Sequence, residues 1–167
     1  MIHIGELYLE RTPEQTRLCA DISMGDRGTT LWFGVAPEQE SYLCTVRSDA
    51  FVLALLPTAM RRGLDLCCET PMSERLHYQL EHYLVPTLAD AGTVYRRVCI
   101  HAPLTDTPVE NMHAVGTRFS GIEDIQYAVT AHGKDSEFPL THLLLFSPTI
   151  LGETPLPDRS GKPCSNA

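Results

Sequence analysis

The sequence is short of positive charge and of long apolar runs. Lys and Arg together number 13, against 21 Asp and Glu, which gives a net charge of −8 over 167 residues. This acidic balance argues against a nucleic-acid backbone or an anionic membrane as the main partner. The longest apolar run, residues 50–57, is far shorter than the ~20 residues that span a bilayer. The first residues also lack the basic and apolar regions of a signal peptide, so we expect a cytoplasmic protein.

The length and the apolar content of 43% suit a globular protein with one good core, or one domain and a fragment of a second. Cysteine is not scarce, because the chain has six. Most of them lie in strand-like apolar stretches, where buried free thiols are common, and we expect them to be reduced. The cysteines are Cys19, Cys44, Cys67, Cys68, Cys99 and Cys164.

The N-terminal region reads as strands followed by a helix. Short apolar stretches rich in β-branched and aromatic residues, separated by Pro and Gly turns, predict strands at residues 4–10, 17–24, 29–35 and 42–46. A helix follows between Ser48, which can cap its start, and Gly63, which can take the left-handed conformation after its end. Pro57 lies inside this helix and should kink it.

A second helix is expected after a short strand at residues 64–69. Thr70 is its predicted N-cap, and Pro71 suits the first helical position. Gly92 should end it, and Pro86 should bend it or end it early. Residues 94–100 then read as another strand. One apolar stripe recurs at every fourth position of the helix: Leu76, Leu80, Leu84 and Leu88.

The C-terminal part predicts a strand, a helix and a strand in that order. Residues 113–119 are strand-like, residues 122–132 are helix-like with Gly133 as a C-cap, and residues 140–146 form an apolar strand typical of a parallel sheet. We therefore predict an α/β fold, in which an N-terminal mixed β-sheet with two helices is followed by a partial doubly wound βαβ unit. The predicted divisions are residues 1–110, residues 111–147 and a disordered tail at 148–167.

The turn before the last helix has the residues of a phosphate-binding loop. Unpaired N–H groups at a helix start favour an anion, and glycine lets the backbone approach it closely. Ser120, Gly121 and Asp124 occupy this turn. Ser120 would donate to phosphate, and the Asp124 carboxylate could hold a Mg²⁺ ion that bridges phosphate oxygens.

The stretch "VGTRFSGIEDIQYAV", with "LTHLLLF" after it, resembles the S-G-G-x-D-S loop of the ATP pyrophosphatases, or PP-loop family. Ser120, Gly121 and Asp124 match that loop, whereas Ile122 replaces its second glycine and Ile125 its last serine. Residues 42–66 are similar to the N-terminal part of uncharacterised bacterial proteins with this loop. The resemblance implies an adenine nucleotide with Mg²⁺ and activation of a substrate by adenylation.

The departures from the loop predict a degenerate and truncated relative. A β-branched residue at 122 disfavours positive φ, and isoleucine at 125 removes a hydroxyl donor. Only one βαβ unit follows the loop, where the family winds about five strands. We therefore expect residual nucleotide binding at Ser120, Gly121 and Asp124 and no adenylation activity. The alternative is a non-catalytic interaction or substrate-recognition module that docks on a partner or self-associates.

A structural interpretation of the same turn is that Ser120 simply caps the helix, with Glu123 at the N3 position completing a capping box. The group Arg47, Ser48 and Asp49 at the first helix start has the same two interpretations, as a cap or as a contact for an anion or a partner.

Metal or redox sites are weaker candidates. His77 and Glu81 share one helix face, but their spacing is not that of the zinc helices, and a solvated face is the favoured interpretation. Cys67 and Cys68 point to opposite faces of a strand and would not bind zinc together. Cys99, His101 and His113 would form a site only if the fold brought them together.

Overall fold

The computed structural model describes residues 1–107, 109, 114–118, 121–133 and 142–146. The chain divides into two compact units, Met1–Pro108 and Val109–Ala167. Each unit is described here by itself. The division falls between residues 108 and 109, where the sequence predicted a boundary between 110 and 111. The predicted tail at 148–167 lies outside the described residues.

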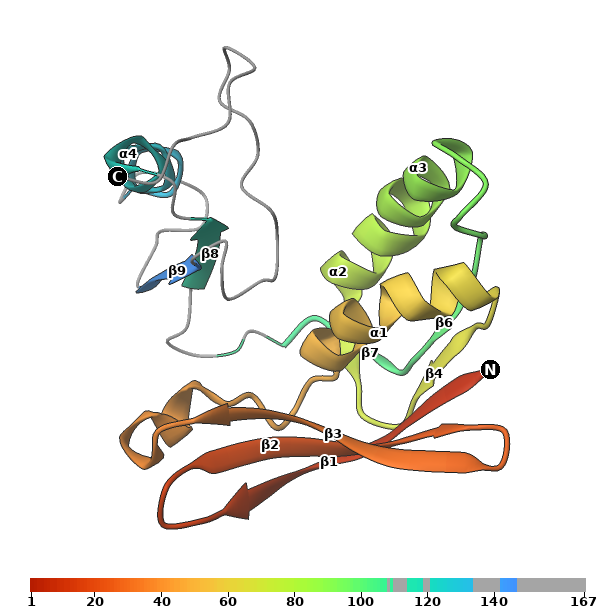
Figure 1. Cartoon of the computed structure of the whole chain (residues 1–167), viewed down its shortest axis with the longest axis horizontal. Helices are drawn as coiled ribbons and strands as arrows, with labels where there is room; N and C mark the ends of the chain where they lie inside the picture. Colours follow the sequence, from red (N-terminus) through yellow and green to blue (C-terminus); the bar gives the residue numbers. More distant parts are fainter. Residues whose placement is uncertain (108, 110–113, 119–120, 134–141, 147–167) are drawn as a thin grey trace, which may run out of the picture. The chain divides into compact units, whose positions relative to one another are not determined.

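The first unit is built on a mixed, five-stranded sheet with the strand order β3-β2-β1-β4-β6 (Figure 1). The first three strands form an antiparallel meander, while β4 runs parallel to β1 and β6 runs parallel to β4. This arrangement confirms the predicted α/β fold with a mixed N-terminal sheet. The strands are β1 (Ile2–Arg11), β2 (Thr16–Met24), β3 (Arg27–Val35), β4 (Leu66–Cys68) and β6 (Ile100–His101).

A bulge in β1 changes which residues face the core. Ile4 pairs with Ile22 and Leu7 pairs with Ala20, so Gly5 and Glu6 together face one residue of β2. The extra residue shifts the alternation by one position, as a β-bulge does. Ile4 on one side of the bulge and Leu7 on the other therefore both pack into the core. Gly5 and Glu6, which lie between them, are left on the opposite face of the sheet.

Helix α1 (Asp49–Arg62) ends as the sequence predicts. Gly63 has φ 65°, the left-handed conformation that favours glycine, and a Cβ there would also lie 2.9 Å from the Arg96 side chain. The Leu64 N–H donates to the Ala59 carbonyl at 3.0 Å, which satisfies an otherwise free group of the last turn. Pro57 lies inside the helix.

The predicted cap at the start of α1 is wrong in its chemistry. Ser48 is the N-cap residue, but its side chain makes no capping hydrogen bond. Its Oγ instead donates to the Pro71 carbonyl at 3.3 Å, and Ser48 is fully buried. Asp49 Oδ1 accepts a 2.8 Å hydrogen bond from the Ser73 N–H. The start of α1 therefore holds the segment that leads into the second helix.

The second helix begins later than predicted. Met72–Ser73 forms strand β5, which pairs in parallel with β7 (Leu104–Thr105), and the helix starts at α2 (Glu74–Gln79) with Ser73 as N-cap. Thr70 is not its cap, because the Thr70 Oγ1 accepts a hydrogen bond from the Leu7 N–H at 3.2 Å. The start of the second helix is therefore set by contacts with β7 and with Leu7 of β1. Both partners lie far away in the sequence, so the residues around the helix start do not reveal them.

The second helix continues beyond α2 through a π-helical turn. This turn, η2 (Leu80–Leu84), leads into α3 (Val85–Asp90), which carries Pro86 in its first turn. Pro86 cannot donate to a carbonyl one turn earlier, and a π turn accommodates such a break without ending the helix. The extra residue in the turn shifts the buried face: Leu80 is 2% exposed and Val85 3%, but Leu84 is 39% exposed. The predicted four-residue stripe is therefore wrong at Leu84.

Two of the predicted strands do not form. Residues 42–46 enter no sheet: Tyr42 is the last residue of a 3₁₀-helix, η1 (Pro37–Tyr42), and residues 43–46 follow it. Within residues 94–100, only Ile100 belongs to a strand. The Arg96 N–H donates to the Met60 carbonyl and the Cys99 N–H to Asp65 Oδ1, and the segment joins the sheet only at its end, where the Cys99 carbonyl accepts the Leu66 N–H at 3.0 Å.

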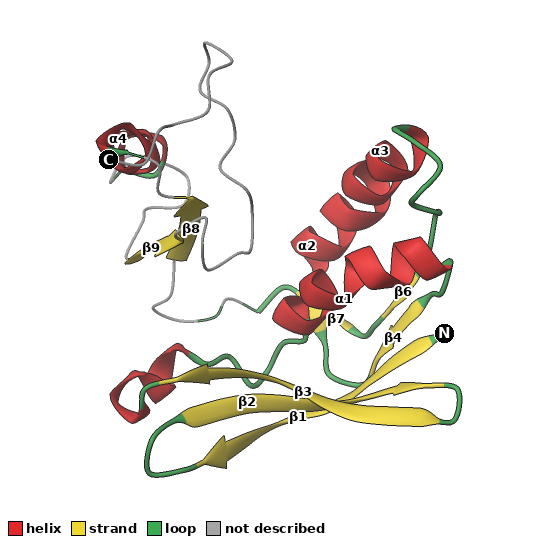
Figure 2. Cartoon of the chain, in the orientation of Figure 1, coloured by secondary structure: helices red, strands yellow, loops and turns green. Residues whose placement is uncertain are grey.

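The core lies between the sheet and the helices, which cover one face of the sheet (Figures 1 and 2). Phe33 from β3 and Phe51 from α1 meet edge to face, with ring centroids 5.0 Å apart. The buried members are Ile2, Ile4, Leu18, Ala20, Ile22, Phe51, Val52, Leu56, Ala59, Met60, Leu66, Cys68, Met72, Leu80, Val85, Val98 and Ile100.

The second unit contains the predicted strand-helix-strand order. Strand β8 (Ala114–Arg118) pairs in parallel with β9 (His142–Phe146), and α4 (Ile122–Ala131) lies between them in the chain. The helix ends at Ala131 with His132 as the C-cap, so the predicted C-cap at Gly133 is wrong by one residue. The His132 N–H donates to the Ala128 carbonyl at 3.0 Å.

Candidate functional site

The start of α4 carries the residues predicted to bind phosphate. Gly121 is the N-cap, and its N–H donates to Asp124 Oδ2 at 3.2 Å. The Asp124 N–H donates in turn to the Gly121 carbonyl at 3.2 Å. The cap box thus lies one residue later than predicted, with Asp124 rather than Glu123 at N3. Ser120, the third predicted contact, lies outside the described residues.

Gly121 does not need to be glycine for conformational reasons. Its φ is −177°, an extended conformation that any residue adopts, and a Cβ at this position would meet none of the described residues within 4 Å. Ile122 follows with its side chain 63% exposed. The Gly121 N–H, which would bind an anion, already donates to the Asp124 carboxylate.

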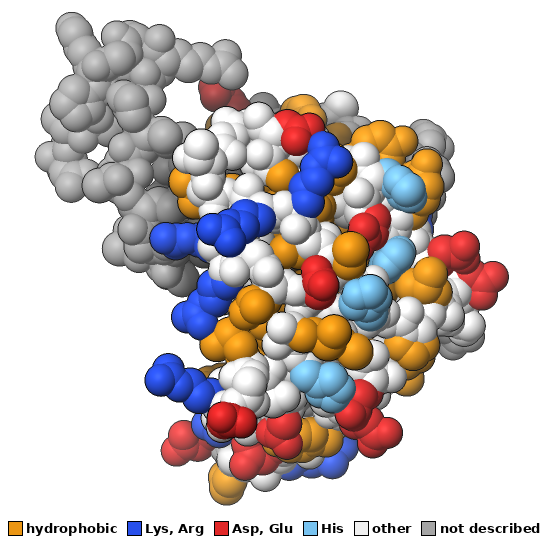
Figure 3. Space-filling view, turned by 90° about the vertical axis from the view of Figure 1, so that its right-hand side faces the viewer, with side chains coloured by type: hydrophobic (Ala, Val, Ile, Leu, Met, Phe, Trp, Pro, Cys, Tyr) orange, Lys and Arg blue, Asp and Glu red, His pale blue; other side chains and the backbone are white. Residues whose placement is uncertain are grey.

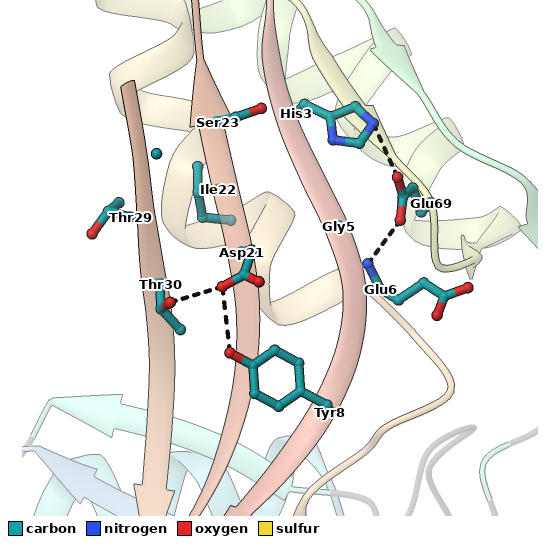
Figure 4. Close-up of a pocket in the computed structure, with 11 residues that line it drawn as sticks. His3, Gly5, Glu6, Tyr8, Asp21, Ile22, Ser23, Thr29, Thr30 and Glu69 are labelled. Carbon is teal, nitrogen blue, oxygen red and sulfur yellow. Dashed lines mark hydrogen bonds and ion pairs between the residues drawn. The ribbon is translucent and has the colours of Figure 1, made fainter. Parts of the chain in front are cut away.

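The first unit has a second candidate site, a groove of about 690 Å³ on the face of the sheet opposite the core. Figure 4 shows Asp21 at its centre, between side chains of β1 and β3. Asp21 Oδ1 accepts hydrogen bonds from Thr30 Oγ1 at 2.7 Å and from the Tyr8 hydroxyl at 3.3 Å. The groove is lined by His3, Gly5, Glu6, Tyr8, Asp21, Ile22, Ser23, Gly28, Thr29, Thr30 and Glu69.

Glu69 closes the groove beside the bulge of β1. One oxygen, Oε1, lies 3.5 Å from His3 Nε2, and the other, Oε2, accepts the Glu6 N–H at 3.0 Å (Figure 4). The bulge turns the Glu6 N–H away from the β-ladder, and Glu69 satisfies it. Sequence reasoning missed this site. The available signal was the break in alternation at Gly5 and Glu6 within an otherwise regular strand.

The groove offers hydrogen-bonding groups rather than a reactive one. A hydrogen bond with Thr30 lowers the pKa of Tyr8, but burial and the charges of Asp21 and Cys19 together raise that pKa above its ordinary value. Burial raises the pKa of the nearby Cys19 thiol, which is 1% exposed. Neither group supplies a ready nucleophile at neutral pH. Among the residues that the structure describes, no cluster of His, Cys, Asp and Glu could hold a metal ion.

His77 and Glu81 do share one helix face, but the favoured interpretation as a solvated face is wrong. His77 Nε2 lies 2.9 Å from the Ile100 carbonyl, to which it donates. Glu81 Oε1 accepts the Ile100 N–H at 2.6 Å. The two side chains thus bind both backbone groups of one residue in β6. These hydrogen bonds hold the second helix against the β6 edge of the sheet.

The remaining predicted candidates are not brought together as ligands. Cys68 is buried and its thiol pKa is raised by that burial, while Cys67 is half-buried; both are free thiols. Cys99 and His101 are both exposed, and His113 lies outside the described residues.

The surface of the first unit carries mixed charge. Figure 3 shows acidic, basic and hydrophobic side chains interspersed on one face, with most of the arginines toward one side and the histidines toward the other. In the part of the chain that the structure describes, no helix is long and apolar enough to cross a membrane.

Comparisons with family models, with curated proteins and with solved structures found no match to this chain.

Proposed function

We propose that this chain is a degenerate relative of the ATP pyrophosphatases that has lost adenylation activity and keeps, at most, weak adenine-nucleotide binding with Mg²⁺ at Ser120, Gly121 and Asp124. The parallel strands β8 and β9 with α4 between them supply the strand-turn-helix geometry that such a loop needs. Many functions share this fold class, so the residues of the loop carry the functional information.

The observation that carries the proposal is the hydrogen bond from the Gly121 N–H to Asp124 Oδ2. A phosphate oxygen would compete with this carboxylate for the same donor, and the two anions would repel each other unless a Mg²⁺ ion lay between them. The residues therefore fit a nucleotide only together with the metal. The missing second glycine and last serine remove further donors, which favours weak binding without chemistry.

Thermal melting with and without Mg-ATP tests this proposal. A ligand at 100 times its Kd adds about 2.7 kcal/mol to the stability of the folded chain, which a melt resolves. We expect a small upward shift of Tm with millimolar Mg-ATP, none with ATP in EDTA, and no pyrophosphate release. The Asp124→Asn variant keeps an acceptor for the Gly121 N–H but loses the charge that holds Mg²⁺, so it should lose the shift while keeping its Tm without ligand.

Two results would contradict the proposal. The absence of any shift in the wild type at millimolar Mg-ATP would leave Asp124 as a helix cap only. In that case Asp124→Ala should still destabilise α4, by about 0.5–2 kcal/mol, because the cap is lost. ATP-dependent release of pyrophosphate would show instead that the loop is active.

The alternative function, a non-catalytic interaction module, is favoured by a separate observation. The face of the sheet opposite the core carries the groove around Asp21, and aromatic side chains lie exposed on it, with Tyr8 43% and Trp32 45% exposed. Register places Tyr8, Cys19 and Trp32 side by side across β1, β2 and β3. Exposed aromatic residues beside polar groups are typical of protein-binding surfaces.

A further inference from the structure

The strand β3 is an edge of the five-stranded sheet and is long for an edge. It pairs with β2 over nine residues, Arg27–Val35, without a register shift. The strand order leaves its other side without a neighbouring strand among those that the structure describes. Native edge strands are usually protected by Lys, Pro, a bulge or short length, since a free ladder of N–H and C=O groups can pair with another chain.

None of these protections occurs in β3. Its sequence, RGTTLWFGV, contains no Pro and no Lys, and Arg27 at one end is its single ionisable side chain. Side chains on the core face of the strand, Leu31 and Phe33, pack against the core but are only half-buried. An added strand would bury them further and would satisfy the free edge.

We propose that β3 is a self-association surface, on which a second copy of this chain pairs through its own β3 in antiparallel orientation. Full overlap of the two strands places Leu31 opposite Leu31 of the second copy, at the centre of the ladder. Thr29 then faces Phe33, and Thr30 faces Trp32, on both sides of the centre. These are pairs of a β-branched residue with an aromatic one, which stabilise antiparallel sheets.

Charge also favours the second copy in this orientation. Antiparallel overlap puts the two Arg27 side chains at opposite ends of the ladder, where they do not repel each other. Each lies opposite Val35 of the other copy, close to the exposed carboxylate of Glu38 just beyond it. Because paired residues share a face, the core faces of both sheets lie on one side, and the helices of both copies cover it.

The inference goes beyond nucleotide binding and is independent of it, because β3 and the loop before α4 belong to different units. It gives the interaction module a definite partner. If Mg-ATP causes no shift of Tm, the proposed β3 pairing is unaffected. If the chain does not dimerise, the interpretation of the Mg-ATP melt is unaffected.

Sedimentation velocity of the full chain in reducing buffer, from about 1 to 100 μM, tests the pairing. We expect a dimer in the wild type. Thr29→Lys places a charge at an exposed position of the edge and should raise the dimer Kd about tenfold or more. Thr58→Lys is the matched control: it makes the same exchange at an exposed position of α1 and should leave the dimer unchanged.

Trp32 gives a second measurement, because it is the sole tryptophan of the chain and lies in the edge strand. On dilution of the wild type, its emission should move to longer wavelength and its quenching by acrylamide should rise. Backbone amides of β3 should exchange faster at low than at high concentration. A wild type that is monomeric throughout, with Trp32 emission and β3 exchange independent of concentration, would overturn the inference. So would equal dimerisation by Thr29→Lys and Thr58→Lys when circular dichroism shows both folded.

Discussion

The two edges of the five-stranded sheet differ in length and in what binds them. At the β6 edge the strand is two residues long, and His77 and Glu81 bind the carbonyl and the N–H of Ile100. At the β3 edge the strand is nine residues long and pairs with β2 alone among the strands that the structure describes. The second helix thus binds the β6 edge, whereas the β3 edge is the one we propose for pairing with a second copy.

The difference shows that the two edges of one sheet can be treated differently, one bound by side chains of a helix and the other not paired with a described strand. Closing the β6 edge required a helix in the right position, and the π turn at Leu80–Leu84 maintains that helix past Pro86. The β3 edge contains no proline, and its one charged side chain, Arg27, lies at the end of the strand. Local rules on strand edges therefore predict opposite behaviour for the two ends of a single sheet.

The largest expected loss of stability comes from a substitution in the helix that binds the β6 edge. Leu80→Ala should lower the free energy of unfolding by about 2–5 kcal/mol, because it empties a site in the core. Leu84→Ala should cost less than about 1 kcal/mol, since the π turn leaves Leu84 exposed at 39%. Urea unfolding of both variants measures the pair. Equal losses would mean that the helix keeps a regular four-residue stripe and that the π turn is absent.

Removing the hydrogen bond between Glu81 and the Ile100 N–H at the β6 edge should have the next largest effect on stability. Glu81→Ala leaves the Ile100 N–H without its acceptor and should destabilise the first unit by about 1–3 kcal/mol. Glu81→Gln keeps an acceptor oxygen and serves as the control, with a smaller loss. Urea denaturation followed by circular dichroism gives both values. If the alanine and glutamine variants lose the same stability, charge rather than the hydrogen bond at Ile100 is what matters.

The stability that the Arg11–Glu40 pair contributes just after β3 should depend on pH. Glu40, in the 3₁₀-helix after β3, receives hydrogen bonds from Arg11 at 2.6 and 2.8 Å, and these bonds lower the pKa of its carboxyl below the ordinary value. The stabilisation is present above the ordinary glutamate pKa and is lost as pH falls through the lowered one. Urea unfolding between about pH 7 and pH 3 should show Glu40→Gln losing less stability on acidification than the wild type.

An unchanged pH slope in Glu40→Gln would indicate that water screens the Arg11–Glu40 pair completely. Arg11→Gln gives the reciprocal check, because it removes the partner that holds the carboxylate charged and should flatten the same acid range.

The smallest effect is expected for the open edge in its monomeric state. Thr29 is exposed, so Thr29→Lys should change the free energy of unfolding by no more than about 0.5 kcal/mol when both chains are compared below the dimer Kd. Urea unfolding at low protein concentration measures it. A loss of several kcal/mol there would show that Thr29 supports the monomer and would remove it as a specific probe of pairing.

Several elements were predictable because their determinants are local. The meander of β1, β2 and β3 follows from alternating apolar residues separated by turns, and the end of α1 follows from Gly63, which adopts φ 65°. The predicted strand at 94–100 forms only at its end, because the Arg96 and Cys99 N–H groups donate to Met60 and Asp65, residues more than thirty positions away. The start of the second helix failed for the same reason, since β5 pairs with β7 across the chain.

The candidate sites divide in the same way. Asp124 at the start of α4 was found from sequence, because a helix start shows in adjacent residues, but the sequence placed the cap one residue too early. The groove around Asp21 was not found, because Tyr8, Thr30 and Glu69 come from separate strands and are ordinary exposed polar residues when each is read alone. Only the register of β1, β2 and β3, with the bulge at Gly5 and Glu6, brings them together.

The class of the fold, the strand-helix-strand order and the start of α4 to within one residue all follow from the sequence, since periodicity and turn residues act over a few positions. The tertiary structure decided which edge of the sheet is closed. His77 and Glu81 look like solvent-facing residues in the sequence, and they become the fastening of β6 because packing brings Ile100 within 3 Å of both. Hydrogen bonds between distant segments depend on how the chain is packed, and no local pattern contains that information.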